Sequence, residues 1–202
     1  MLPSSDILVD ASNTLFSLLA LIVSGVTAWL TLFRRGKVRM TRPKHLFFGW
    51  EKGPDGPSPK IFLRSLLFST GERGRVVESM YLRVRREQRS TLFSFWAYGE
   101  RNDLAPGSGF FVGREGVVFN HHFLPASDEP EFGFIAGVYT VEVYATVLNR
   151  KRPTKLAEVR LTLTESASAQ MYNAGAGVLF DWNPDTQRYS FEIDPKGKLG
   201  TF

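Results

Sequence analysis

The sequence predicts an all-β domain, built as an antiparallel β-sandwich and preceded by one transmembrane α-helix. Three observations support this fold class: a long uncharged run near the N-terminus, frequent Pro and Gly after it, and segments in which every second residue is apolar. About 150 residues follow the uncharged run, which is enough for one domain with a buried core. The composition, with 17 Phe, 6 Tyr and 4 Trp, is typical of a folded chain.

Residues 11–33 contain no charged side chain over 23 consecutive positions. As an α-helix, this run is long enough to cross a hydrocarbon core of about 30 Å. No Lys or Arg precedes the run, so we expect a retained anchor rather than a cleaved signal peptide. The Ser and Thr hydroxyls within it are expected to donate to the helix backbone.

Basic residues are concentrated directly after this run. They are Arg34, Arg35, Lys37, Arg39, Arg42 and Lys44, and we expect them to contact anionic lipid headgroups at the membrane surface. Lys and Arg beside a transmembrane end stay on the cytoplasmic side, which predicts a single-pass protein of the plasma or inner membrane with its N-terminus outside. From residue 45 onward, 19 basic residues face 18 acidic ones, so the high pI does not indicate nucleic-acid binding.

The expected organisation is therefore a short tail at 1–10, a transmembrane helix at 11–33, a basic juxtamembrane segment at 34–45 and a β-sandwich at 46–202. The chain has no Cys, which excludes disulfides, thiolate metal sites and a Cys nucleophile. This absence is compatible with a reducing compartment such as the cytosol.

Apolar and polar residues alternate in several segments of the domain. In 76–86, Met80, Leu82 and Val84 lie on one face, while Tyr81, Arg83 and Arg85 lie on the other. In 137–147 the apolar face comprises residues 139, 141, 143, 145 and 147, and 157–163 has the same pattern. Strands with one apolar face must bury it, so two sheets packed face to face are expected.

Pro and Gly mark the expected connections. We expect a loop at 53–59 and three hairpins, which join 61–69 to 76–86, 109–112 to 117–119, and 178–182 to 189–193. Residues 166–176 are a stretch of small residues between expected strands.

Residues 136–143, with a small residue and Tyr139 before alternating apolar positions, resemble the penultimate strand of immunoglobulin-like domains. The resemblance covers about a dozen residues and implies an immunoglobulin-like sandwich, in which the Tyr139 hydroxyl bonds back to the backbone at a corner. The Cys pair of antibody domains is absent. The resemblance concerns architecture and does not imply a function.

Gly107-Ser108-Gly109-Phe110 and the later Asn120-His121-His122 resemble the region around the catalytic His of trypsin-like proteases. That resemblance would make His122 a general base, but no later Ser lies in a Gly-Asp-Ser-Gly-Gly turn, so the triad is incomplete. Adjacent residues of a strand face opposite sides, so His121 and His122 are not expected to share a metal ion. We predict no catalytic residue, no metal site and no cofactor.

The leading functional hypothesis is a membrane-anchored module that binds another protein at the cytosolic membrane surface. Candidate contact residues are Tyr81, Arg83 and Arg85 on one strand, and Asp128, Glu129 and Glu131 in the loop at 125–131.

Two alternatives to this hypothesis remain. One is an effector that perturbs the membrane when its transmembrane helices assemble as a homo-oligomer, with Gly25 allowing close helix packing. The other is a hydrolase that uses His122.

Overall fold

The computed structural model describes residues 5–33, 36–53, 56–98, 104–126 and 132–195. An apolar N-terminal helix, α1 (Ser5–Ala28), continues into a π-helical turn (Trp29–Phe33) and leads to a domain that is mostly β-strand. The strands are β1 (Val38–Met40), β2 (His45–Gly53), β3 (Gly56–Ser69), β4 (Arg75–Arg86), β5 (Arg89–Tyr98), β6 (Leu104–Pro106), β7 (Phe110–Val112), β8 (Val117–Pro125), β9 (Gly137–Val147), β10 (Thr154–Leu163), β11 (Gly177–Asn183) and β12 (Arg188–Asp194). A short helix, α2 (Glu165–Ala174), lies between β10 and β11.

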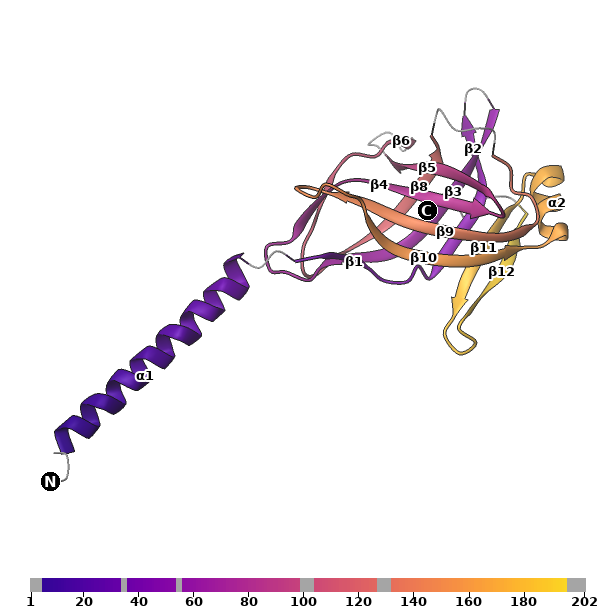
Figure 1. Ribbon diagram of the computed structural model, residues 1–202. Coiled ribbons are helices and arrows are strands. Elements are labelled where there is room, and N and C mark those ends of the chain that lie inside the picture. Colours follow the sequence, from indigo (N-terminus) through magenta and orange to yellow (C-terminus); the bar gives the residue numbers. More distant parts are fainter. Residues whose placement is uncertain (1–4, 34–35, 54–55, 99–103, 127–131, 196–202) are drawn as a thin grey trace.

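The helical segment Asn13–Thr31 is long and apolar enough to cross a membrane, and none of it is buried against the domain (Figure 1). The hydroxyls of Ser17, Thr27 and Thr31 each donate to a backbone oxygen four residues earlier, at 2.8 Å. This confirms the expected local bonding, and it leaves these donors satisfied without water.

The strands form one antiparallel sheet in the order β10-β9-β4-β5-β8-β3-β2-β11-β12. Three short strands extend it, because β1 pairs with β3, β6 with β5 and β7 with β4. The sheet folds back on itself: the ring centroids of Phe48 on β2 and Tyr139 on β9 are 5.5 Å apart, although four strands separate these two along the sheet. One apolar face therefore packs against itself.

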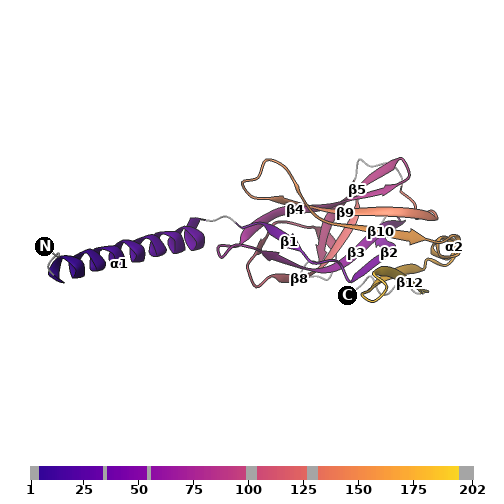
Figure 2. The same ribbon diagram turned by 60° about the horizontal axis from the view of Figure 1, so that its bottom comes forward.

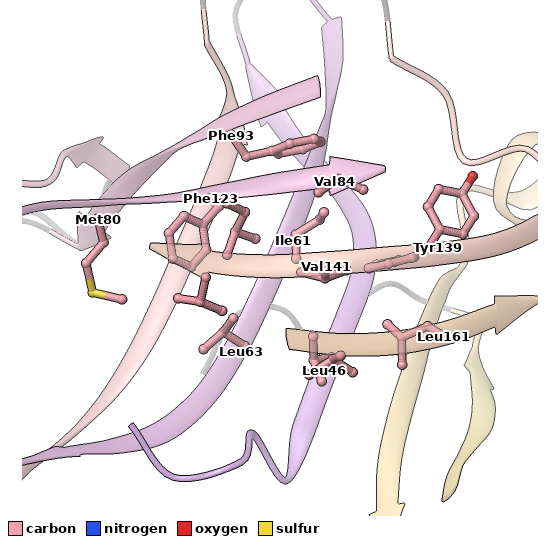
Figure 3. Packing of buried hydrophobic residues seen from close by; sticks show 14 of the residues in the cluster. Leu46, Ile61, Leu63, Met80, Val84, Phe93, Phe123, Tyr139, Val141 and Leu161 are labelled. Carbon is pink, nitrogen blue, oxygen red and sulfur yellow. The ribbon is translucent and has the colours of Figure 1, made fainter. Parts of the chain in front are cut away.

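The buried core comes from alternate residues of nearly all the long strands, as the period-two patterns predict (Figure 3). The expected apolar face of β9 is buried throughout, and β10 pairs with it in the matching register, with Val159 opposite Val141. The Tyr139 hydroxyl donates to the backbone oxygen of Ile135 at 2.5 Å, which is the type of hydrogen bond that the resemblance implied.

Two of the three expected hairpins are wrong. The turn at 70–74 connects β3 to β4, but β3 pairs with β1, β2 and β8, and β4 pairs with β5, β7 and β9. Likewise β7 pairs with β4, whereas β8 pairs with β3 and β5. Each of these turns therefore connects two strands that are not neighbours in the sheet. The hairpin of β11 and β12 is confirmed.

Other expected boundaries also differ from the structure. The predicted loop at 53–59 is wrong, because β2 and β3 stay paired as far as Gly53 and Gly56. Pro57 and Pro59 are tolerated there since β8 pairs with β3 only from Ile61 onward, which leaves a free edge. Residues 165–174 form α2, an element that the sequence pattern did not predict.

The domain also includes part of the expected juxtamembrane segment. β1 pairs with β3, placing Val38 opposite Ser69, and Val38 is buried in the core.

Candidate functional site

The candidate residues Tyr81, Arg83 and Arg85 share the outer face of β4, as predicted, while their neighbours Leu82 and Val84 are buried. Sheet pairing places Tyr144 of β9 opposite Tyr81, and Glu142 opposite Arg83. We call this surface the aromatic-arginine face; it comprises Tyr81, Arg83, Arg85, Glu142, Tyr144 and Lys155.

Aromatic and guanidinium groups are stacked on this face. The rings of Tyr81 and Tyr144 are nearly parallel, 6° apart in plane, with centroids separated by 5.0 Å. The Arg83 guanidinium lies 5.2 Å from the centre of the Tyr144 ring. Stacking restricts these side chains, so they are arranged before any partner arrives.

Glu142 is buried beneath the basic side chains of this face. Its Oε1 accepts from Arg85 Nη2 at 2.9 Å and from Lys155 Nζ at 2.6 Å, and Lys155 also pairs with Glu158. Burial raises the pKa of Glu142, but the hydrogen bond and charge of Lys155, together with the charges of Arg85 and Arg83, outweigh it, so the pKa lies below its usual value. The carboxylate therefore holds two cations in place.

Sequence patterns alone did not identify three members of the face, namely Glu142, Tyr144 and Lys155. Glu142 and Tyr144 lie on β9 and Lys155 on β10, and only strand pairing brings them beside β4. A polar Glu inside the most regular apolar strand is the signal that could have indicated a buried ion pair. The other predicted contact residues, Asp128, Glu129 and Glu131, lie outside the described residues.

The six basic residues expected at the membrane surface have different positions. Arg34 and Arg35 lie outside the described residues. Lys37 and Arg39 lie beside the turns that end β3 and β9, where they line a pocket of about 230 Å³ together with Arg150. Arg42 stacks at 4.0 Å on the ring of Trp182, and the backbone oxygen of Lys44 accepts from Trp182 N, so this part of the segment is attached to β11.

His121 and His122 lie on opposite faces of β8, as the strand period predicts. His121 is buried against Phe95 and Phe123, while His122 packs against Phe62 and Tyr98. Burial lowers the pKa of His121 to about 4; burial, with the charges of Lys60 and His121, lowers that of His122 to about 3.

Neither histidine site has the geometry of a catalytic or metal centre within the described residues. No partner accepts from or donates to the ring nitrogens of His122 there, so no Ser–His pair is formed. In the same part of the chain, no three His, Asp or Glu side chains are grouped as ligands.

Lys60 is a buried cation on the outer side of β3, close to His122. Its Nζ donates to Glu51 Oε2 at 2.7 Å and to the Tyr98 hydroxyl at 3.2 Å. An ion pair with an additional hydrogen bond satisfies a buried ammonium, so this cluster has a structural explanation.

The described geometry thus presents one prearranged polar surface, on β4 and β9. Comparison with known proteins adds no family to this description: no protein-family model matches the chain, and no curated protein sequence is similar to it.

Proposed function

We propose that this protein is a membrane-anchored binding module, whose aromatic-arginine face recognises an acidic segment of another protein at the cytosolic membrane surface. The observation that carries the proposal is the stacked arrangement of Tyr81, Tyr144 and Arg83, beside the ion pairs that Glu142 makes with Arg85 and Lys155. Tyr and Arg dominate the binding energy of protein interfaces, and prearranged side chains lose little entropy on binding.

The charge of the outer sheet surface favours an acidic partner. The charged side chains of β4, β9 and β10 on this surface include Arg83, Arg85, Lys155 and Arg160, against Glu142 and Glu158, which is a net charge of +2. Because Glu142 is already bound by two of these cations, Arg83 and Arg160 are the groups that can meet a carboxylate.

The proposal includes three finer claims. The domain is an immunoglobulin-like sandwich, supported by the antiparallel sheet and the Tyr139 hydrogen bond. The helical segment Asn13–Thr31 spans a membrane, supported by its length and composition. The domain faces the cytosol, supported by the basic residues directly after the helix.

A site-specific cross-linking experiment tests the binding face. A photo-crosslinking amino acid replaces the exposed Leu92, which lies opposite Arg83 on β5, in the full-length protein in its membrane. We expect a discrete adduct that weakens about tenfold in a variant with Arg83→Ala and Arg85→Ala. The double variant keeps the fold, since Lys155 still pairs with Glu142.

The matched control places the same cross-linker at the exposed Glu192 on β12, where no adduct is expected. A second control replaces two exposed basic residues away from the face, Lys52→Ala and Arg188→Ala, and should leave the Leu92 adduct intact. An adduct that survives loss of Arg83 and Arg85, or no adduct at all, would contradict the proposal.

A further inference from the structure

The chain enters the β domain at one end, where four segments are joined by hydrogen bonds. Lys37 N donates to Thr70 Oγ1 at 2.9 Å, and Thr70 N donates to the oxygen of Lys37 at 3.0 Å. Ser69 N donates to the oxygen of Gly113 at 2.8 Å, so the turn after β7 is attached to the turn after β3.

The turn between β9 and β10 belongs to the same end. Leu148 N donates to the oxygen of Val76 at 2.9 Å, and Arg75 Nη2 donates to the oxygen of Leu148 at 3.1 Å. Figures 1 and 2 show this turn on the side of the domain where α1 joins, while α2 lies at the opposite side. We call this region the tethered end; it comprises residues 36–39, 70–76, 111–118 and 148–153.

The tethered end is strongly basic. Its exposed charged residues are Lys37, Arg39, Arg73, Arg114, Arg150, Lys151 and Arg152, against Glu72 and Glu115. Seven cations and two anions leave a net charge of +5, whereas the chain from residue 45 onward totals only +1. Arg114 pairs with Glu72, but Arg150, Lys151 and Arg152 form no ion pair within the described part of the chain.

Large apolar side chains are exposed on the same end. Phe111 and Val118 are each 58% exposed. The exposed Val76 pairs with Phe111, and its backbone oxygen accepts from the backbone N of the exposed Leu148. These are four of the nine large apolar side chains exposed in the described β domain. Apolar side chains surrounded by Lys and Arg are typical of surfaces that insert shallowly into anionic bilayers.

The short connection between the apolar helix and the tethered end favours a lipid bilayer over another protein as the binding partner of this surface. Lys37 lies only six residues after Thr31, the last residue of the apolar helical segment, so this end cannot move far from the membrane. An anionic leaflet complements the positive charge of the tethered end, and the effective concentration of lipid beside this end is high.

We propose that the tethered end docks on the anionic headgroups of the membrane in which the protein is anchored, with Phe111 at the level of the headgroups. This inference rests on the proposed membrane anchorage.

Docking would hold the domain in one orientation. Strand β4 runs from Arg75 at the tethered end to Arg86, which at about 3.3 Å per residue places its far end roughly 35 Å away. Tyr81, Arg83 and Arg85 lie in the half of this strand away from the tethered end, whereas Lys155 lies beside the pocket that Lys37 and Arg150 line. Docking therefore leaves the β4 residues of the proposed binding face accessible.

Full-length protein in nanodiscs tests the docking. Because the chain has no Cys, Glu115→Cys places a single environment-sensitive fluorophore on the tethered end, and Glu192→Cys places a matched one on β12. In discs of mixed phosphatidylcholine and phosphatidylglycerol, we expect a blue-shifted emission at 115 and about tenfold less access to a neutral aqueous quencher than at 192. Protection at 115 should be lost in discs of phosphatidylcholine alone.

Charge reversal at Arg150, Lys151 and Arg152 to Glu should shift the docked population by about 100-fold or more and abolish the protection. Replacing three exposed basic residues elsewhere, Lys52, Arg64 and Arg188, with Glu makes the same change in net charge. This control should leave the protection at 115 unchanged. A second variant, Phe111→Ala, keeps every charge and should reduce protection in the same direction.

The outcomes separate the two proposals. A protein that enters the discs but is equally accessible at 115 and 192 overturns the docking and leaves the anchorage intact. Protection that persists in discs of phosphatidylcholine alone, or after reversal of Arg150, Lys151 and Arg152, overturns the role assigned to anionic lipid. A protein that does not enter the discs overturns the anchorage itself.

Discussion

His121 and His122 show how a single residue step on a strand changes the surroundings of a side chain. His121 is fully buried in the aromatic core, while the adjacent His122 lies on the other side of β8 against Tyr98. Burial disfavours the imidazolium in both, so each pKa falls below the usual value of about 6.5. Both rings are therefore neutral near pH 7.

This difference in pKa between the folded and unfolded chain predicts a loss of stability in acid. Between about pH 6.5 and pH 4 the unfolded chain protonates residue 121 and the folded chain does not, so stability falls with decreasing pH; above pH 7 the histidine adds no pH dependence. His121→Leu should lessen the fall by up to about 1.4 kcal/mol per pH unit. Thermal unfolding of the full-length protein in mild detergent from pH 7.5 to 5 measures this.

The control is Leu63→Ala, which removes the buried neighbour opposite His121. It should lower the melting temperature by a similar amount at every pH, because no titratable group is changed. An unaltered pH slope in His121→Leu would contradict the buried neutral histidine.

At the level of elements, α2 contributes to stability by closing the end of the core farthest from α1. The Thr164 side chain accepts from Ala167 N at the first turn, and Gly175 ends the helix with a φ of 62°. Met171 is buried, its backbone oxygen accepts from Trp50 Nε1 at 3.1 Å, and Ser168 Oγ donates to the oxygen of Phe134 at 2.7 Å. The helix is thus attached by side chains and by backbone.

Met171→Ala should lower the free energy of unfolding by about 2 to 4 kcal/mol, because it leaves a cavity beneath α2. The matched control is Gln170→Ala, one residue earlier and exposed, which should change stability by less than about 0.5 kcal/mol. Urea unfolding monitored by Trp fluorescence measures both. Equal effects of the two substitutions would mean that α2 does not cover the core.

For the whole molecule, the uneven charge distribution is the feature with the widest consequences. Basic residues follow the apolar helix in sequence, and folding places Arg150, which Lys151 and Arg152 follow in the chain, beside Lys37 and Arg39. In the proposed anchorage, one side of the membrane would therefore attract the juxtamembrane segment during insertion and the tethered end after folding.

Moving the flanking charges should reverse the orientation. Replacing Arg34, Arg35 and Lys37 with Ser, together with Pro3→Lys and Ser4→Lys, should place the domain outside in a large fraction of molecules. A single Cys at Glu192 reports the side, because a membrane-impermeant maleimide labels it only when it is external. External labelling at residue 192 in the protein with unaltered flanks, or no increase in labelling after the charges are exchanged, would contradict the proposed cytosolic location.

Much of the local structure was predictable from the sequence. The period of two identified the core faces of β4, β9 and β10, and the length of the uncharged run identified the helix. These features depend on residues close in sequence, so their physical cause is visible there. The same holds for Tyr81, Arg83 and Arg85, whose common face follows from strand geometry.

Pairing partners were not predictable, and the hairpins at 70–75 and 113–116 show why. Turn residues predict that the chain changes direction, but which strands become neighbours depends on how the whole sheet buries its apolar face.

The short helix α2 was missed because its small residues have no strong apolar period, although Thr164 and Gly175 mark its ends.

By itself, therefore, the sequence determined an apolar helix, a mainly β domain and the inward-facing residues of its strands, because short-range periodicity encodes all three. Only the tertiary structure decided which polar residues meet. It placed Glu142 and Lys155 beside Arg85, and it placed the turn at 148–153 beside Lys37, since both contacts join segments far apart in the chain and arise only when the sheet folds back on itself.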